Sequence, residues 1–208
     1  MPAELIELHE ITPDKRRIRE ISNSFKQGKL IIIPTDTIYA IACDLHNRKG
    51  IEQICKLLGK KPNKANLSLL CKDLTHLAAY CKPLPNPVFK LMKRVLPGPF
   101  TFILNATNEV AKVFKTNKKT VGIRVPNNEI VQSILSELGN PIISSSIHSE
   151  DEILEYLTEP SSIYEEWKHK VDIVLDGGAG KNMGSTVIDC TESQPFIVRE
   201  GLGIDLLN

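Results

Sequence analysis

The residues best suited to chemistry follow a short apolar stretch near the N-terminus. Thr35, Asp36 and Thr37 come directly after the run Leu30–Ile33 and Pro34. The β-branched residues of this run predict a buried strand, and Pro34 ends its ladder because proline has no N–H to donate. Ligands of open α/β sheets tend to bind just beyond strand ends, so two hydroxyls and a carboxylate there indicate a binding site. The same residues are also typical of a turn whose side chains bond to nearby backbone, and both interpretations stay open.

Helical and strand-like patterns alternate along the rest of the chain. Thr12 is the expected N-cap of the first helix, and Asp73 that of a short one. Longer helices are predicted over residues 13–27, 50–58, 88–96, 129–138, 152–157 and 162–170, and strands over 30–33, 67–71, 100–104, 119–125, 141–145, 171–175, 186–189 and 196–198. Some connections are too short for a crossover helix. We therefore expect residues 1–208 to form a single α/β domain with a twisted, mostly mixed open sheet flanked by helices.

Composition narrows the class of protein. The chain has 208 residues, of which 41% are hydrophobic and 25% charged, as is usual for a globular domain. No apolar run approaches the roughly 20 residues that span a bilayer. The N-terminal MPAELIELHEI carries acids where a signal peptide needs Lys or Arg, so we expect a cytoplasmic protein that binds no membrane. Five cysteines without a CxxC pair suggest neither a disulfide framework nor a metal site.

The charges are segregated, although the formal net charge is only +1. Residues 56–124 contain fourteen Lys and Arg but only Asp73 and Glu109, an excess of +12. Such a basic centre suggests an anionic ligand, which would be a phosphate compound, a nucleic acid or both. Solvated helix faces would give the same count. The common nucleotide fingerprints GxxxxGK[ST] and GxGxxG are absent from the sequence, so any nucleotide must be bound by another arrangement.

Six fragments resemble the YrdC/YciO family and occur in that family's order over nearly the whole chain. PTDTIYAIACD from Pro34 resembles its PTDTVYGLG-type opening, with Ala40 in place of the usual Gly. The other five are PGPFTFIL (97–104), TVGIRVP (120–126), PIISSS (141–146), GSTVID (184–189) and IVREG (197–201). Several family members make threonylcarbamoyl-AMP from ATP, threonine and bicarbonate, for the tRNA modification t6A. The resemblance implies a YrdC-like fold and this kind of chemistry.

The resemblance also implies roles for individual residues. Arg124 would pair with the threonine carboxylate, because a guanidinium offers a planar two-donor fork. Thr35, Lys64, Ser144 and Ser185 would complete the threonine site, while Lys60, Lys61, Thr120, Ser146 and Arg199 would contact ATP. Catalysis would rest on Arg124, Lys60 and Lys61, which position the reactants and stabilise phosphate charge, with Mg2+ assisting.

The departures from the synthase pattern fall on its nucleotide motifs. Leu58 stands where the synthase branch has Lys, and Lys60 or Lys61 where it has Arg. Its SAN motif reads Ser146-Ile147-His148 here. These changes make the chain most similar to the YciO-like branch. Two functions stay open. One is a threonylcarbamoyl-AMP synthase. The other is a YciO-like paralogue that binds nucleotides, tRNA or double-stranded RNA without efficient synthesis.

Overall fold

One mixed sheet organises the fold, which confirms the predicted α/β domain, and it has ten strands among the described residues. The computed structural model describes residues 1–61, 65, 67–114, 119–148 and 156–207. From one edge to the other, the strands are β1 (Glu4–Glu7), β8 (Ile173–Asp176), β2 (Ile31–Ile33), β3 (Ala40–Asp44), β7 (Ile142–Ser146), β4 (Ser68–Leu70), β6 (Thr120–Arg124), β5 (Phe100–Asn105), β9 (Thr186–Asp189) and β10 (Phe196–Arg199). The sheet is mixed: it contains parallel pairs such as β4 with β6 and antiparallel pairs such as β2 with β3.

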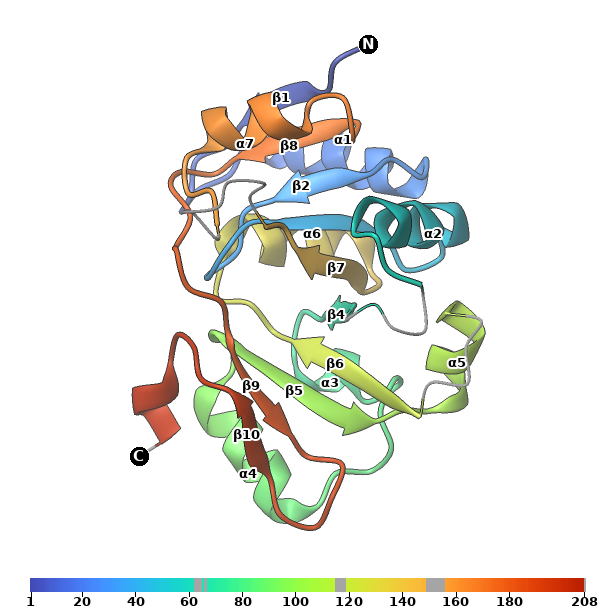
Figure 1. Ribbon diagram of the computed structural model, residues 1–208, viewed down its shortest axis with the longest axis vertical. Helices are drawn as coiled ribbons and strands as arrows, with labels where there is room; N and C mark the ends of the chain where they lie inside the picture. The colour runs from blue at the N-terminus through green and yellow to red at the C-terminus, as the bar shows by residue number, and fades with distance from the viewer. Residues whose placement is uncertain (62–64, 66, 115–118, 149–155, 208) are drawn as a thin grey trace.

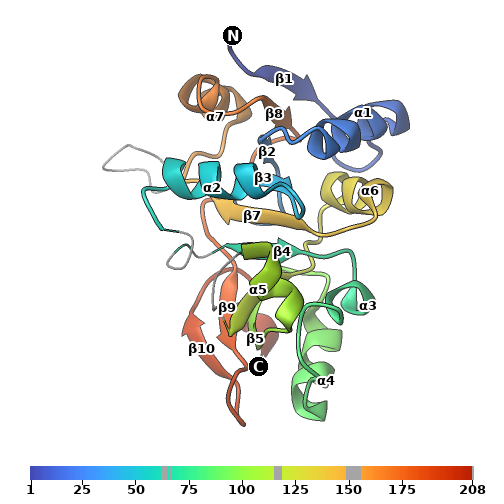
Figure 2. The same ribbon diagram turned by 90° about the vertical axis from the view of Figure 1, so that its right-hand side faces the viewer.

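Helices lie on both faces of the sheet. They are α1 (Lys15–Lys26), α2 (Arg48–Leu57), α3 (Leu74–Leu77), α4 (Asn86–Val95), α5 (Asn108–Phe114), α6 (Glu129–Leu138) and α7 (Pro160–Trp167), followed by the 3-10 helix η1 (Ile204–Leu207). In Figure 1, α2 and α7 lie in front of the upper strands, while α1 and α6 lie behind them. The view turned by 90° shows α1 and α6 together on one side of these strands and α2 and α7 on the other (Figure 2).

The face under α1 and α6 is covered along only half of the sheet. Ile18, Ile21 and Phe25 of α1 form one buried cluster with strand residues such as Ile31 and Ile142. This cluster includes residues of β2, β3 and β7, but none of β5 or β9. In Figure 1, none of the described helices lies in front of β6, β5 and β9; because the sheet twists, the face that lies under α1 and α6 and points away from the viewer in the upper half turns toward the viewer over these strands. The same sheet therefore has a covered half and an open half on one face.

Most predicted elements are confirmed, some with shifted ends. The helix at 129–138 has the predicted bounds, because Asn128 caps its start and Gly139 adopts φ +79 at its end. The first helix begins at Lys15 rather than Pro13: the N-cap is Asp14, while the Thr12 hydroxyl bonds to the His9 ring. The predicted helix at 152–157 lies largely outside the described residues. Sequence reasoning missed β1, β3 and α5.

Candidate functional site

A cavity of about 410 Å³ lies over the open half of the sheet. Its lining comes from strands that are far apart in the sequence, from β3 to β10. These strands are neighbours in the sheet, where β7 and β4 lie side by side. The lining residues are Ala40, Lys60, Leu67, Ser68, Thr101, Ile103, Thr120, Gly122, Arg124, Ser144, Ser145, Ser146, His148, Ser185, Val187, Val198 and Arg199. Most of the strand residues in this set are small or carry a hydroxyl.

Strand alternation explains why the cavity floor is polar. Ser68, Gly122 and Ser144 are paired across β4, β6 and β7, so their side chains share one face. Leu70 on β4 and Ile142 on β7 lie two positions from Ser68 and Ser144 and on the same face. Both are buried in the cluster under α1 and α6. A Cβ at Gly122 would lie 3.0 Å from the Ser68 hydroxyl, so glycine keeps the floor low. On this face, β4 and β7 are thus apolar under the helices and carry serines in the cavity.

Arg124 is the most deeply buried cation at the cavity. Its Nη2 donates to Asp36 Oδ1 at 2.8 Å and to Thr37 Oγ1 at 2.9 Å, and both side chains of the ion pair are 7% exposed. Burial lowers the pKa of the guanidinium, and the nearby Asp36 carboxylate opposes that shift. Within the described part of the chain, the buried Nε has no hydrogen-bond partner. A buried guanidinium with an unused donor is suited to receive an anionic ligand group.

The loop from Pro34 to Tyr39 joins β2 to β3 as an antiparallel pair. Thr35 is a turn residue here: its hydroxyl donates to the Ile38 carbonyl at 2.7 Å and accepts from the Thr37 N–H at 3.0 Å. Thr35 is 8% exposed and does not line the cavity. Asp36 and Thr37, which the family roles leave unassigned, are the members of this loop that contact Arg124.

Arg199 reaches the cavity from strand β10. Its Nη2 and Nε donate to the Ser185 carbonyl at 2.8 and 3.3 Å, while the Ser185 hydroxyl lies 2.7 Å from the Thr101 hydroxyl. This close arrangement requires Gly201, because a Cβ there would lie 2.4 Å from the Gly184 carbonyl oxygen. The glycine that ends the IVREG fragment therefore lets two backbone segments cross beside the site.

The structure brings together most of the residues predicted from the sequence. Arg124, Lys60, Thr120, Ser144, Ser146, Ser185 and Arg199 all line the cavity. Lys61 is exposed and is not among the lining residues, and Lys64 lies outside the described residues. The roles of these side chains stay predictions. Sequence reasoning missed Ser68 and Thr101, although strand alternation at 67–71 and the PGPFTFIL fragment were available signals.

The cavity presents positive charge. Its described lining includes Lys60, Arg124 and Arg199 but no Asp or Glu. Asp36 lies behind Arg124 rather than in this lining. An anionic compound that also carries hydroxyl or amine groups would match this combination of cations and Ser and Thr hydroxyls.

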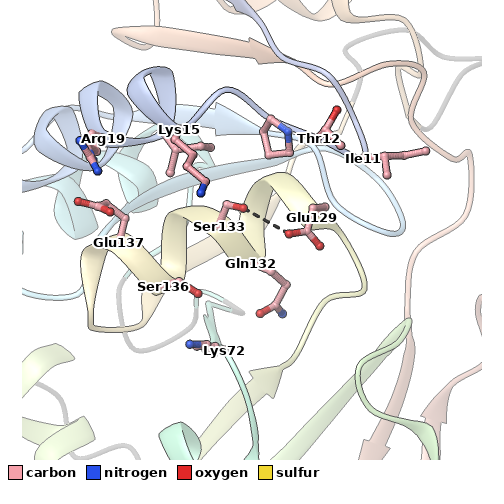
Figure 3. A pocket seen from close by; sticks show the side chains of 12 residues that line it. Ile11, Thr12, Lys15, Arg19, Lys72, Glu129, Gln132, Ser133, Ser136 and Glu137 are labelled. Carbon is pink, nitrogen blue, oxygen red and sulfur yellow. Dashed lines mark hydrogen bonds between the residues drawn. The ribbon is translucent and has the colours of Figure 1, made fainter.

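A second groove, between α1 and α6, differs in its chemistry. It has a volume of about 580 Å³ and contains none of the predicted site residues. Figure 3 shows Lys15 and Arg19 on α1 and Glu129 and Glu137 on α6, with Lys72 below them. Both signs of charge line this groove, so it lacks the uniform positive charge of the cavity. We therefore place the candidate site in the cavity over the open half.

Comparison with known proteins identifies the relatives of this chain. Residues 23–201 match the Sua5_yciO_yrdC family model, which is described as telomere recombination. The uncharacterized protein YciO of Escherichia coli is 36% identical over 198 residues, 94% of each chain, and the crystal structure of E. coli YciO aligns with a TM-score of 0.88 at 34% identity over 97% of each chain.

Threonylcarbamoyl-AMP synthases are more distant relatives. The one from Pyrococcus abyssi is 27% identical over 186 residues, which cover 89% of this chain but 54% of the synthase. The crystal structure of P. abyssi Sua5 complexed with L-threonine aligns with a TM-score of 0.83 at 26% identity, over 95% of this chain and 57% of that one. None of the helices among the described residues is long and apolar enough to cross a membrane. Sequence match, fold and relatives together show that the chain belongs to the Sua5/YciO/YrdC family.

Proposed function

We propose that the cavity binds threonine and ATP and joins them with bicarbonate to form threonylcarbamoyl-AMP. The observation that carries the proposal is Arg124, a buried cation at the cavity whose Nε has no hydrogen-bond partner in the described part of the chain. A carboxylate supplies the acceptor that such a donor lacks. The relation to proteins that make threonylcarbamoyl-AMP, and the complex of one of them with L-threonine, support this choice of ligand.

The cavity lining includes two groups of side chains that would suit the two substrates. Arg124 and Ser144 would hold the threonine, with Ser185 completing the polar contacts. Lys60 and Arg199 would take the phosphates, and Thr120 and Ser146 would bond to the rest of the nucleotide. Each charge-assisted contact would contribute about 1.5–3 kcal/mol.

The chemistry needs positioning rather than covalent help from the protein. The threonine amine attacks bicarbonate to give a carbamate and water, and the carbamate oxygen then attacks the α-phosphorus of ATP while pyrophosphate leaves. The cations would offset the charge that builds up on the phosphate oxygens. Because the described lining lacks Asp and Glu, Mg2+ would enter bound to the ATP phosphates rather than to protein carboxylates. The product would serve tRNA modification to t6A.

A turnover assay tests this proposal. Purified protein is mixed with labelled ATP, threonine, bicarbonate and Mg2+, and pyrophosphate and threonylcarbamoyl-AMP are followed. We expect product that depends on all three substrates and is lost in Arg124→Ala. Arg94→Ala is the matched control, because Arg94 is an exposed arginine of α4 that bonds to the Leu207 carbonyl and is not among the residues that line the cavity. Absence of product from the wild-type protein at saturating substrates contradicts the proposal.

A second candidate function is binding of tRNA or double-stranded RNA without efficient synthesis. The excess of +12 over residues 56–124 favours it. Part of this charge lies on α4, where Lys90 and Lys93 are exposed and Val88 and Met92 are buried. Exposed lysines on one helix would contact phosphates without reading bases.

Salt dependence tests the RNA function. In a plot of the logarithm of the association constant against the logarithm of salt concentration, each neutralised phosphate contributes a slope of about −0.7 to −0.9. If RNA binds through the exposed lysines of α4, we expect a steep slope for duplex RNA. In a Lys90→Glu and Lys93→Glu double variant, the slope should correspond to about two fewer neutralised phosphates. A slope near zero in the wild-type protein excludes this function.

A further inference from the structure

The contacts of Asp36 suggest a role for a residue that does not itself line the cavity. Asp36 Oδ1 accepts from Arg124 Nη2 at 2.8 Å, and Oδ2 accepts from the Asn127 backbone N–H at 3.1 Å. Both carboxylate oxygens of Asp36 therefore accept a hydrogen bond. Asn127 follows β6 along the chain, so Asp36 also ties the loop after β2 to the end of the strand that carries Arg124.

These bonds fix the orientation of the guanidinium. The group is planar and carries five N–H donors in a rigid arrangement. Nη2 is held by two acceptors, Asp36 and Thr37, whereas Nε has none among the described residues. Because the donors of a planar group cannot turn independently, holding Nη2 also sets the direction of Nε. An arginine side chain without such an anchor would lose this alignment to its many rotamers.

Thr37 shows that the anchor is built rather than incidental. Its hydroxyl accepts from Arg124 at 2.9 Å and lies 3.1 Å from the Thr35 hydroxyl, which is itself held by the Ile38 carbonyl at 2.7 Å. The loop is thus held by internal hydrogen bonds and presents Asp36 and Thr37 to Arg124. No further carboxylate contacts Arg124 in the described part of the chain.

We propose that Asp36 is a positioning residue, which holds Arg124 so that its remaining donors meet the carboxylate of the amino-acid substrate. The proposal rests on the proposed function, in which Arg124 takes that carboxylate. Asp36 does not touch the substrate and leaves the nucleotide contacts of Lys60 and Arg199 unchanged. A purely structural ion pair would instead affect folding and both substrates alike.

A double-mutant cycle separates positioning from a structural role. Binding of threonine and of threonine amide is measured by calorimetry for wild type, Asp36→Asn, Arg124→Ala and the double variant. We expect Asp36→Asn to weaken threonine binding about tenfold or more, as truncating one partner of a buried charge pair does. Threonine amide, which lacks the carboxylate, should bind nearly equally to all four proteins. The double variant should match Arg124→Ala, because Asp36 would act only through Arg124.

Two controls protect this test against loss of the fold. Asp44→Asn replaces another buried carboxylate, whose oxygens bond to the His46 N–H and the Asn140 amide, and it should leave threonine affinity unchanged. Asp36→Glu keeps the charge, and we expect it to restore part of the affinity. Thermal unfolding of each variant, and unchanged KM for ATP, would show that the effect is confined to the amino acid.

The outcomes distinguish the two levels of the proposal. The positioning role alone would be overturned if the wild-type protein binds threonine and Asp36→Asn binds it equally or more tightly. Additive effects in the cycle, or equal losses for threonine, threonine amide and ATP, would also overturn it. Wild-type protein that binds no threonine would overturn the proposed function and the positioning role together.

Discussion

The covered and open halves of one sheet face use the same strands for different purposes. On β7, Ile142 is buried against the helices, while Ser144 and Ser146, on the same face, line the cavity. On β4, Leu70 is buried in the same cluster and Ser68 lies in the cavity. The difference teaches that the described helices cover one half of this face and leave the strands of the other half to form the floor of the cavity. Stability should therefore depend on the covered half and binding on the open half.

The largest expected effect is loss of stability on the covered half. Ile134 is fully buried in α6, within the cluster that packs on β2, β3 and β7. We expect Ile134→Ala to lower the free energy of unfolding by about 2–5 kcal/mol, because it leaves a cavity in a packed core. Urea denaturation measures this change. Threonine affinity of the folded protein should stay within error, and a large loss of affinity would break the division between the halves.

Extending the apolar pattern into the open half should weaken threonine binding and leave the free energy of unfolding nearly unchanged. Ser144→Val places a β-branched residue on β7, which strands favour, but it removes a hydroxyl and adds volume in the cavity. We expect unfolding free energy to change by less than about 1 kcal/mol, while threonine binding weakens about tenfold, or 1.4 kcal/mol. Calorimetry of threonine binding checks the affinity, and Ser136→Val in the groove between α1 and α6 is the control.

Raising the cavity floor should have a smaller effect. The Cβ of Gly122→Ala would lie 3.0 Å from Ser68 Oγ and 3.6 Å from a Thr101 methyl, so the Ser68 side chain must shift by a few tenths of an ångström. We expect threonine or ATP affinity to fall by about twofold to fivefold, since only one methyl group enters the cavity. Combining it with Ser68→Gly should restore binding. If the double variant is as weak as the single one, contact with Ser68 is not the cause.

The smallest expected effect belongs to an exposed cation. Lys60 lines the cavity and is exposed, so its contact with a phosphate is weakened by solvent. We expect Lys60→Ala to weaken ATP binding by about threefold to tenfold at low salt and by less at high salt. Lys61→Ala, one residue away but outside the cavity lining, should have little effect. Equal losses for both lysines would contradict the position of the cavity wall.

Local patterns predicted the fold well where one strand or helix depends on its own residues. Helix 129–138 has both a capping Asn and a terminal Gly, so its bounds follow from the sequence. Strand β3 was missed because Ala40, Ala42 and Cys43 are small residues without a clear strand pattern. It is a strand because it pairs with β2 on one side and β7 on the other, and such long-range pairing overrides local preference.

The site shows the same limit. Resemblance to the family indicated Arg124, Ser185 and Arg199, and the structure brings all three to one cavity. It did not indicate that Asp36, 88 residues from Arg124, holds the guanidinium. It assigned Thr35 to the threonine, whereas the structure shows its hydroxyl bonded within the loop, and the role stays a prediction. Contacts between residues far apart in sequence depend on strand order, which no single fragment contains.

The position of Arg199 on an edge strand links nucleotide binding to local opening of the fold. Among the described strands, β10 pairs only with β9, and its residues Phe196 to Arg199 are all exposed. Edge elements with few buried contacts open at a lower free energy than the centre of a sheet. When β10 separates from β9, Arg199 and Val198 leave the cavity while Arg124 stays, and by linkage a bound nucleotide must slow that separation. Deuterium exchange of the β10 amide hydrogens would therefore report whether a nucleotide is bound in the cavity. The exchange should slow on ATP binding and respond little to threonine.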